Sequence, residues 1–145
     1  EDVSWTVEPV RLPVSKHMDE ESLRATMEDK EIAGPMRYMA AKHLAWLERC
    51  RRGDQTELSC LALREARILH LPGELFVAYQ LTAQKMRPDL HVAMAAYGDY
   101  APGYIGTEVA YTQGGYETSP SASLVDPTVE RVLLDGLRKL LEAPE

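Results

Sequence analysis

The sequence predicts one domain of the α/β or α+β class, with a mixed sheet that contains a hairpin and a central strand and is covered by about four helices. Apolar runs of strand length alternate along the chain with segments whose apolar residues recur every three or four positions. The 145 residues suffice for one hydrophobic core, and the content of 45% hydrophobic and 27% charged residues is typical of a globular protein.

The N-terminal third predicts one edge strand and two helices. Residues 3–14 alternate apolar and polar side chains, and the prolines within them cannot donate to a sheet, which favours an edge position. Residues 19–30 begin with acids and continue with helix formers. In residues 35–51, apolar side chains three and four positions apart form one stripe, which includes His43. We therefore expect His43 to be a core residue with satisfied hydrogen bonds.

The middle of the chain predicts a hairpin, a helix and a central strand. Residues 56–71 contain two short apolar runs joined by the polar pair Arg64-Glu65, which a hairpin explains most simply. A helix is expected over about 73–86. The nearly continuous apolar run at 90–98 is typical of a central strand that is buried on both faces.

The last third predicts a long loop and a final helix. Residues 99–125 are rich in Gly, Pro, Ser, Thr and Tyr, and long loops within compact domains are often functional. The pair Asp126-Pro127 then opens the last helix, with an acid at the N-cap and a proline at the first helical position.

The charge balance argues against a nucleic-acid partner. The formal net charge is -7, so the chain has no basic excess to neutralise phosphates. Arg49, Arg51 and Arg52 cluster, but Glu48 and Asp54 flank them, which indicates a solvated helix end.

The number of cysteines argues against a disulfide-rich or zinc-knuckle protein, and the hydropathy argues against a membrane-spanning helix. Cys50 and Cys60 are too few for a disulfide framework or a zinc knuckle, and their spacing does not require a bridge. No apolar run approaches the ~20 residues of a membrane-spanning helix. No signal peptide is visible and the chain starts at Glu1 without a methionine, so we expect it to be a processed or trimmed part of a longer protein.

Glu74 is the first candidate for chemistry, because it follows Pro72-Gly73 at the junction between a predicted strand and a predicted helix. An acid in the first turn of a helix interacts favourably with the helix dipole, by ~0.3–1 kcal/mol. Ligand sites in open α/β sheets also gather at the carboxyl ends of strands. The pattern alone leaves both the capping and the ligand interpretation open.

The second candidate is a tyrosine-rich segment at 97–117, which also contains acidic residues and five glycines. Its tyrosines are Tyr97, Tyr100, Tyr104, Tyr111 and Tyr116. Each ring offers a rigid surface and a hydroxyl that donates, accepts or binds a metal, which is typical of a site. The alternative is a loop held on the sheet by its tyrosines.

The remaining residue types give weaker signals. The four histidines, at 17, 43, 70 and 91, show no spacing typical of a metal site. Ser119, Ser121 and Ser123 have no evident paired base, so we interpret them as structural. The sequence contains no nucleophile elbow, P-loop or dinucleotide-binding glycine pattern.

Two segments, "LPGELF" and "GYIGTEVAYTQGGYE", resemble the end of the catalytic domain of the neutral/alkaline (non-lysosomal) ceramidase family, in its bacterial branch. The resemblance covers roughly residues 56–142, and "WTVEPVRLPV" is similar to the region just before it. It implies a zinc-dependent amidase in which Glu74 and Tyr104 are zinc ligands. It also implies that Tyr116, twelve residues further on, stabilises the reacting carbonyl.

The resemblance further implies that this chain is the C-terminal portion of such a catalytic domain. Its partner is then the upstream part of the same domain, which supplies two histidine ligands and the family's catalytic serine. The substrate is an amide or a lipid amide, and the location is secreted or periplasmic. The segment 98–102 differs from the family's Asn-x-Tyr pattern, which puts the substrate pocket in question. The alternatives are a degenerate paralogue or a non-catalytic interaction module, and apolar surface left by a missing portion favours a homo-oligomer.

Overall fold

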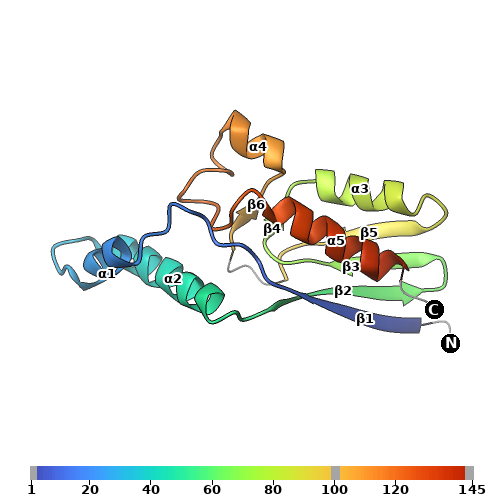
Figure 1. The fold of residues 1–145 in the computed structure, drawn as a ribbon, viewed down its shortest axis with the longest axis horizontal. Helices are drawn as coiled ribbons and strands as arrows, with labels where there is room; N and C mark the ends of the chain where they lie inside the picture. The colour runs from blue at the N-terminus through green and yellow to red at the C-terminus, as the bar shows by residue number, and fades with distance from the viewer. Residues whose placement is uncertain (1–2, 99–101, 143–145) are drawn as a thin grey trace.

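The computed structural model describes residues 3–98 and 102–142, which form a mixed α/β structure with a four-stranded sheet, a two-stranded sheet and five helices (Figure 1). The predicted fold class is confirmed. The elements in chain order are β1 (Val3–Val10), α1 (Glu20–Glu28), α2 (Gly34–Arg51), β2 (Thr56–Leu63), β3 (Ala66–His70), β4 (Glu74–Leu75), α3 (Ala78–Met86), β5 (His91–Ala95), β6 (Tyr104–Ile105), α4 (Glu108–Gln113) and α5 (Val129–Glu142).

The larger sheet has the order β1-β2-β3-β5. The predicted hairpin is confirmed, because β2 and β3 are antiparallel and Arg64, in the turn, has a φ of 51°. Strand β1 lies at an edge, as its prolines predict. The prediction that the run at 90–98 is central is wrong, because β5 is the opposite edge and pairs with β3 in parallel. Its apolar character comes largely from alanines, which cost little when exposed, and in this strand only Val92 is buried.

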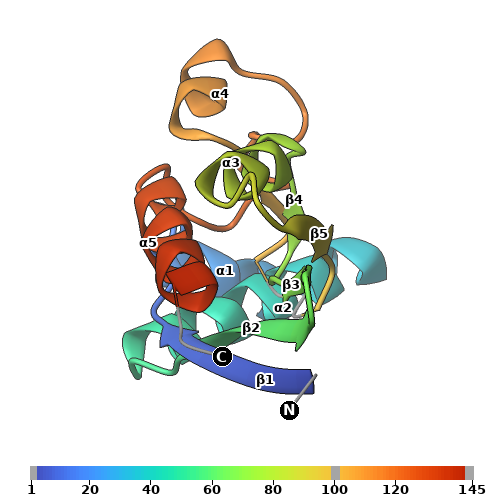
Figure 2. The ribbon, with the colours of Figure 1, turned by 90° about the vertical axis from the view of Figure 1, so that its right-hand side faces the viewer.

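The core lies between one face of this sheet and the helices α3 and α5, which both cover that face (Figure 2). Leu58 of β2 and Leu69 of β3 are completely buried in this core, as are Leu133 and Leu137 of α5. Gly136 allows α5 to approach closely, since a Cβ at this position would lie 2.5 Å from Leu58 Cδ1. The sheet–helix core therefore depends on a glycine in the middle of a helix.

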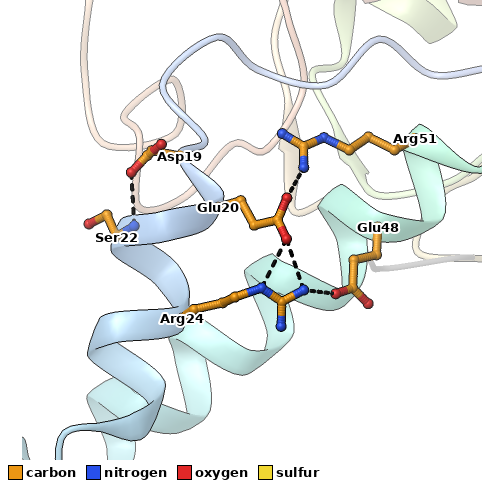
Figure 3. Close-up of polar contacts among 6 residues, drawn as sticks. All are labelled: Asp19, Glu20, Ser22, Arg24, Glu48 and Arg51. Atoms are coloured by element: carbon orange, nitrogen blue, oxygen red, sulfur yellow. Dashed lines mark hydrogen bonds and ion pairs between the residues drawn. The ribbon is translucent and has the colours of Figure 1, made fainter.

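Helices α1 and α2 pair beyond the end of the sheet, and charged side chains join them (Figure 3). The Arg24 guanidinium donates to Glu20 at 2.9 Å and to Glu48 at 2.7 Å, and Arg51 also donates to Glu20. These bonds lower the pKa of the Glu20 carboxyl, and the bond from Arg24 contributes more than the bond from Arg51. The basic cluster at the end of α2 is thus a solvated helix end, as predicted. Asp19 caps α1 by accepting from the Ser22 amide at 2.8 Å.

Three boundaries differ from the sequence prediction. The segment 99–125, predicted as loop, contains β6 and the six-residue helix α4. The helix expected from residue 73 begins at Ala78, because Glu74 and Leu75 form β4 instead. Helix α5 begins at Val129, and Asp126 caps the turn before it by accepting from the Thr128 amide.

The two cysteines do not pair, since Cys50 and Cys60 are both free thiols. Among the helices in the described residues, none combines the length and the apolar character that crossing a membrane requires.

Replacement of Gly136 by alanine is expected to destabilise the protein. Alanine favours a helix interior by about 0.5–1 kcal/mol, but its methyl group would clash with the buried Leu58, and overpacking a core costs about 1–3 kcal/mol. Urea denaturation of Gly136→Ala should show a lower free energy of unfolding. Gly34→Ala is the matched control, because no heavy atom lies within 4 Å of a Cβ there. Equal or greater stability of Gly136→Ala would contradict the close packing.

The carboxylate of Asp126 should stabilise the fold in a pH-dependent way. The Thr128 amide and hydroxyl donate to it at 3.0 and 2.8 Å, which lowers its pKa, and Lys16 lies 3.6 Å away. A lowered pKa in the folded state gives stability that is complete above the unfolded pKa of about 3.9 and is lost as pH falls through the folded pKa.

Asp126→Asn keeps an oxygen acceptor and removes the charge. At pH 7, the Asp126→Asn protein should therefore have a lower free energy of unfolding than the unsubstituted protein. At pH 3, the difference between the two proteins should be smaller. Asp135→Asn, which alters an exposed ion pair, serves as the control. A deficit of the same size at both pH values would show that the charge of Asp126 is not the stabilising element.

Candidate functional site

The short strands β4 and β6 bring two of the predicted site residues together. They are parallel, and Glu74 lies opposite Tyr104 in their register. The Glu74 amide donates to the Gly103 carbonyl at 2.9 Å, and the Phe76 amide donates to the Ile105 carbonyl at 3.1 Å. Neighbouring strands lie about 4.8 Å apart, and residues opposite one another project to the same face. Glu74 and Tyr104 are thus neighbours on one face of this small sheet.

Two glycines make this pairing possible. Gly73 and Gly103 both have a φ of +69°, a conformation that favours glycine. A Cβ at Gly73 would lie 2.7 Å from the Gly103 carbonyl oxygen, and one at Gly103 would lie 2.3 Å from the Ala122 carbonyl oxygen. The Pro-Gly before Glu74 and the Gly before Tyr104 are therefore requirements of the backbone that sets the two side chains side by side.

The structure overturns the helix-cap interpretation of Glu74. The residue lies in β4 and not in a first helical turn, and the N-cap of α3 is Val77, which provides no side-chain cap. Its side chain is partly buried and belongs to the surface that Tyr104 shares. The acid at this junction therefore lacks the local role that the sequence pattern favoured.

Tyr116 extends the pair to three residues. Its ring contacts the ring of Tyr104 edge to face, with centroids 5.9 Å apart and an interplanar angle of 73°. The turn that carries Tyr116 is held by Ser119, whose amide and hydroxyl donate to the Tyr116 carbonyl at 3.0 and 2.6 Å. Tyr116 is nevertheless 67% exposed, so its ring is accessible from solvent.

A pocket of about 130 Å³ opens beside the two tyrosines, and residues of α2 form its other wall. Its lining includes Tyr104, Tyr116 and Ser121 from the tyrosine-rich segment, with Lys42 and His43 from α2. Among residues 3–98 and 102–142, no carboxylate side chain lines it, and Glu74 lies outside the lining. The pocket thus presents phenol, hydroxyl, ammonium and imidazole groups to a ligand.

The expectation that His43 is a satisfied core residue is wrong. Its side chain is partly exposed, and its ring makes no hydrogen bond within the part of the chain that the structure describes. Burial lowers its pKa, and the positive charge of Lys42 and the neighbouring His17 lower it further. The stripe of α2 is buried at Ala40, Leu44 and Leu47 but exposed at Met36 and Met39, which helical spacing alone does not reveal.

An apolar groove between α1 and α2 continues from this pocket. It has a volume of about 360 Å³ and shares Met39 and His43 with the polar pocket. The other residues that line it are Leu23, Thr26, Pro35, Met36 and Ala40. Polar and apolar binding surfaces therefore meet at Met39 and His43.

The other tyrosines of the segment are Tyr97, Tyr100 and Tyr111, and the side chain of Tyr111 has a structural role. The Tyr111 hydroxyl bonds to Ser123 Oγ at 2.7 Å, and burial raises the pKa of this phenol. It holds the loop in place, as the alternative interpretation of the tyrosine cluster predicted. Tyr97 has a positive φ of 69°, and its amide donates to the Gly73 carbonyl at 2.8 Å. Tyr100 lies outside the described residues.

The three serines differ in their surroundings. Ser123 is buried and bonded to Tyr111, and Ser119 supports the turn at Tyr116. These contacts agree with the structural role predicted for both. Ser121 lies in the pocket wall and is within 3.1 Å of the Ser119 hydroxyl.

The donor set of Glu74 and Tyr104 fits part of a zinc site. Zinc accepts carboxylate oxygen, and the tyrosine supplies a second oxygen donor. Within residues 3–98 and 102–142, no group of three or more His, Cys, Asp or Glu side chains is arranged to hold a metal ion. A four-coordinate site built on this pair would need two further ligands from outside these residues.

Comparison with known proteins finds a solved structure with a similar fold. No family model matches the sequence, and no curated protein matches it. Among solved structures, neutral ceramidase from Pseudomonas aeruginosa is similar, with a TM-score of 0.51 and 15% sequence identity. The alignment covers 98% of this chain and 29% of the ceramidase chain, so the protein spans less than a third of the length of that enzyme. The chain therefore has a ceramidase-like fold, equivalent to one part of that larger structure.

Proposed function

We propose that the chain is the C-terminal part of the catalytic domain of a zinc-dependent amide hydrolase, with Glu74 and Tyr104 as two of the zinc ligands. The observation that carries the proposal is the register of β4 and β6, which sets the carboxylate residue opposite the phenol residue. Two histidines from the upstream part of the same domain complete the site. The likeness of the fold to a neutral ceramidase is consistent with this assignment.

The residues of this chain have separate tasks in the proposed reaction. Zinc, when bound, polarises the amide carbonyl and lowers the pKa of a bound water to about 7. Glu74 and Tyr104, whose backbone positions the pairing of β4 with β6 sets opposite one another, would hold the metal through their side-chain oxygens. Tyr116 contacts the Tyr104 ring and is solvent-accessible, so its hydroxyl is suited to donate a hydrogen bond to the carbonyl oxygen as negative charge develops there.

The groove between α1 and α2 favours a lipid amide over a small polar amide. It meets the tyrosine pocket at Met39 and His43, and two of its lining residues are methionines, which adapt to irregular apolar ligands. An aliphatic chain in this groove would leave its polar end beside Tyr104 and Tyr116. Sequence patterns did not predict this groove, because its lining residues come from two separate helices.

The zinc assignment is tested by metal analysis of the full-length protein. The unsubstituted protein should contain about one zinc per chain, and Glu74→Gln should weaken zinc binding at least about tenfold, because a charged ligand is lost. Zinc content after dialysis against a chelator series measures the change. Glu65→Gln, in the exposed turn of the hairpin, is the control with unchanged zinc content. Zinc that survives Glu74→Gln unchanged would overturn the assignment and favour a non-catalytic module.

The role of Tyr116 predicts a loss of turnover without a loss of metal. Tyr116→Phe removes one hydrogen-bond donor, so kcat for a long-chain N-acyl amide should fall about 10²–10³-fold while zinc content stays unchanged. The matched control is Tyr38→Phe, at an exposed tyrosine of α2 that does not line the pocket. A Tyr116→Phe enzyme with normal kcat would exclude Tyr116 from carbonyl stabilisation.

A further inference from the structure

One face of the four-stranded sheet lacks the helices that cover the other face. Helices α3 and α5 lie on the same side, and α1 and α2 pair beyond the end of the sheet (Figures 1 and 2). We call the uncovered side the open sheet face. It is defined by three rows of residues that run across β1, β2, β3 and β5 in register. The rows are Val3, Leu63, Ala66 and His91; Trp5, Leu61, Ile68 and Ala93; and Val7, Ser59, His70 and Ala95.

The open sheet face has the composition of a buried surface. No Asp, Glu, Lys or Arg occurs in its three rows, and the next row on the same face, Pro9 and Glu57, adds one exposed acid at its border. Its large apolar side chains are nevertheless exposed, with Trp5 at 59%, Val7 at 40% and Ile68 at 37%. A sheet that faces water on one side normally alternates apolar and polar residues, so that polar side chains line the wet face. A contiguous apolar patch on a folded domain marks an interaction surface.

The open sheet face ends at a pocket beside the segment that precedes Glu74 in the chain. At its end lies a pocket of about 480 Å³, whose lining includes Trp5, His70 and Pro72 together with the charged residues Arg49 and Glu57. The His70 ring packs against Gly98, where a Cβ would lie 2.3 Å from the ring. Pro72 is two residues before Glu74. A layer that covers the face and fills this pocket would therefore contact Pro72, at the start of the segment that carries Glu74.

We infer that the open sheet face is the interface on which the remaining polypeptide of the larger catalytic domain packs as an additional layer. The inference shares with the proposed function only the premise that this chain is one part of a larger domain. The chain aligns over 98% of its length with 29% of one longer chain, so in that structure the same fold is part of a larger unit. An interface whose three central rows lack charged side chains, with charges only at its border, resembles a divided domain core more than a transient contact. The covering layer approaches the site from the side of Pro72.

Cysteine accessibility in the full-length protein tests the inference. Val7→Cys and Ile68→Cys place a thiol on the open sheet face, whereas Val77→Cys and Val109→Cys place one at exposed positions elsewhere, at 68% and 59% exposure. Maleimide labelling of the first pair should be at least about tenfold slower than labelling of the second pair. The unsubstituted protein, with Cys50 and Cys60, provides the background rate. Sedimentation should show that the protected protein is a monomer.

Two results would overturn the inference. Labelling of Val7→Cys and Ile68→Cys at the rate of the controls would mean that the face stays open. Protection that disappears on dilution, together with a dimer in sedimentation, would mean that a second copy covers it. Hydroxyl-radical footprinting of the unsubstituted protein checks the same point without a substitution, since Trp5 should be oxidised more slowly than the exposed Tyr38. Neither readout depends on zinc or activity, so failure of the proposed chemistry is seen separately.

Discussion

The backbone pairing of β4 with β6 is the constraint on which the candidate site depends. These strands have only two residues each, yet their register determines which side chains share a face. The pairing is tied to the larger sheet at both ends, because β4 follows β3 and the β5 connection returns as β6. The Tyr97 amide adds a bond to the Gly73 carbonyl at 2.8 Å. These backbone bonds fix the main-chain positions of Glu74 and Tyr104 opposite one another.

The segment around β6, although rich in glycine and tyrosine like a loop, is held in one conformation by hydrogen bonds. Gly103 accepts the close approach of the Ala122 carbonyl, and the Tyr104 amide donates to that carbonyl at 3.0 Å. The phenols of Tyr79 and Tyr111 reach Gly106, one donating to its carbonyl and the other accepting from its amide. Glycine and tyrosine are thus complementary here. The glycines allow backbones to meet, and the phenols satisfy the polar groups that this meeting buries.

The two faces of the larger sheet differ in how their apolar side chains are covered. The helices α3 and α5 bury one side of the sheet, and just past the carboxyl ends of the parallel strands β3 and β5 the Gly98 amide donates to the Leu71 carbonyl at 3.2 Å. The remaining side keeps rows of apolar residues in contact with solvent. Ligand sites in α/β sheets lie at the carboxyl ends of strands, and the candidate site follows that rule. It lies where the covered core, the open sheet face and the α1–α2 groove approach one another.

The sequence by itself determined the elements whose signals are local: the hairpin at Arg64-Glu65, the edge strand with its prolines, and the helix capped by Asp19. The motifs around Glu74, Tyr104 and Tyr116 were also visible, since they depend on residues near one another in the chain. Only the tertiary structure decided that Glu74 lies in a strand and not in a helix. Two-residue strands have no periodicity of their own and exist only through their partners.

Tertiary structure also decided the roles of His43 and of the run at 90–98. A histidine on a helical stripe and a strand rich in alanine both have the pattern of buried elements, because the pattern records only side-chain polarity. Whether another element covers them depends on contacts between distant segments, such as α2 with the tyrosine loop and β5 with β3. The local conformation follows from nearby residues, whereas burial and the assembly of a site follow from packing that no short stretch of sequence contains.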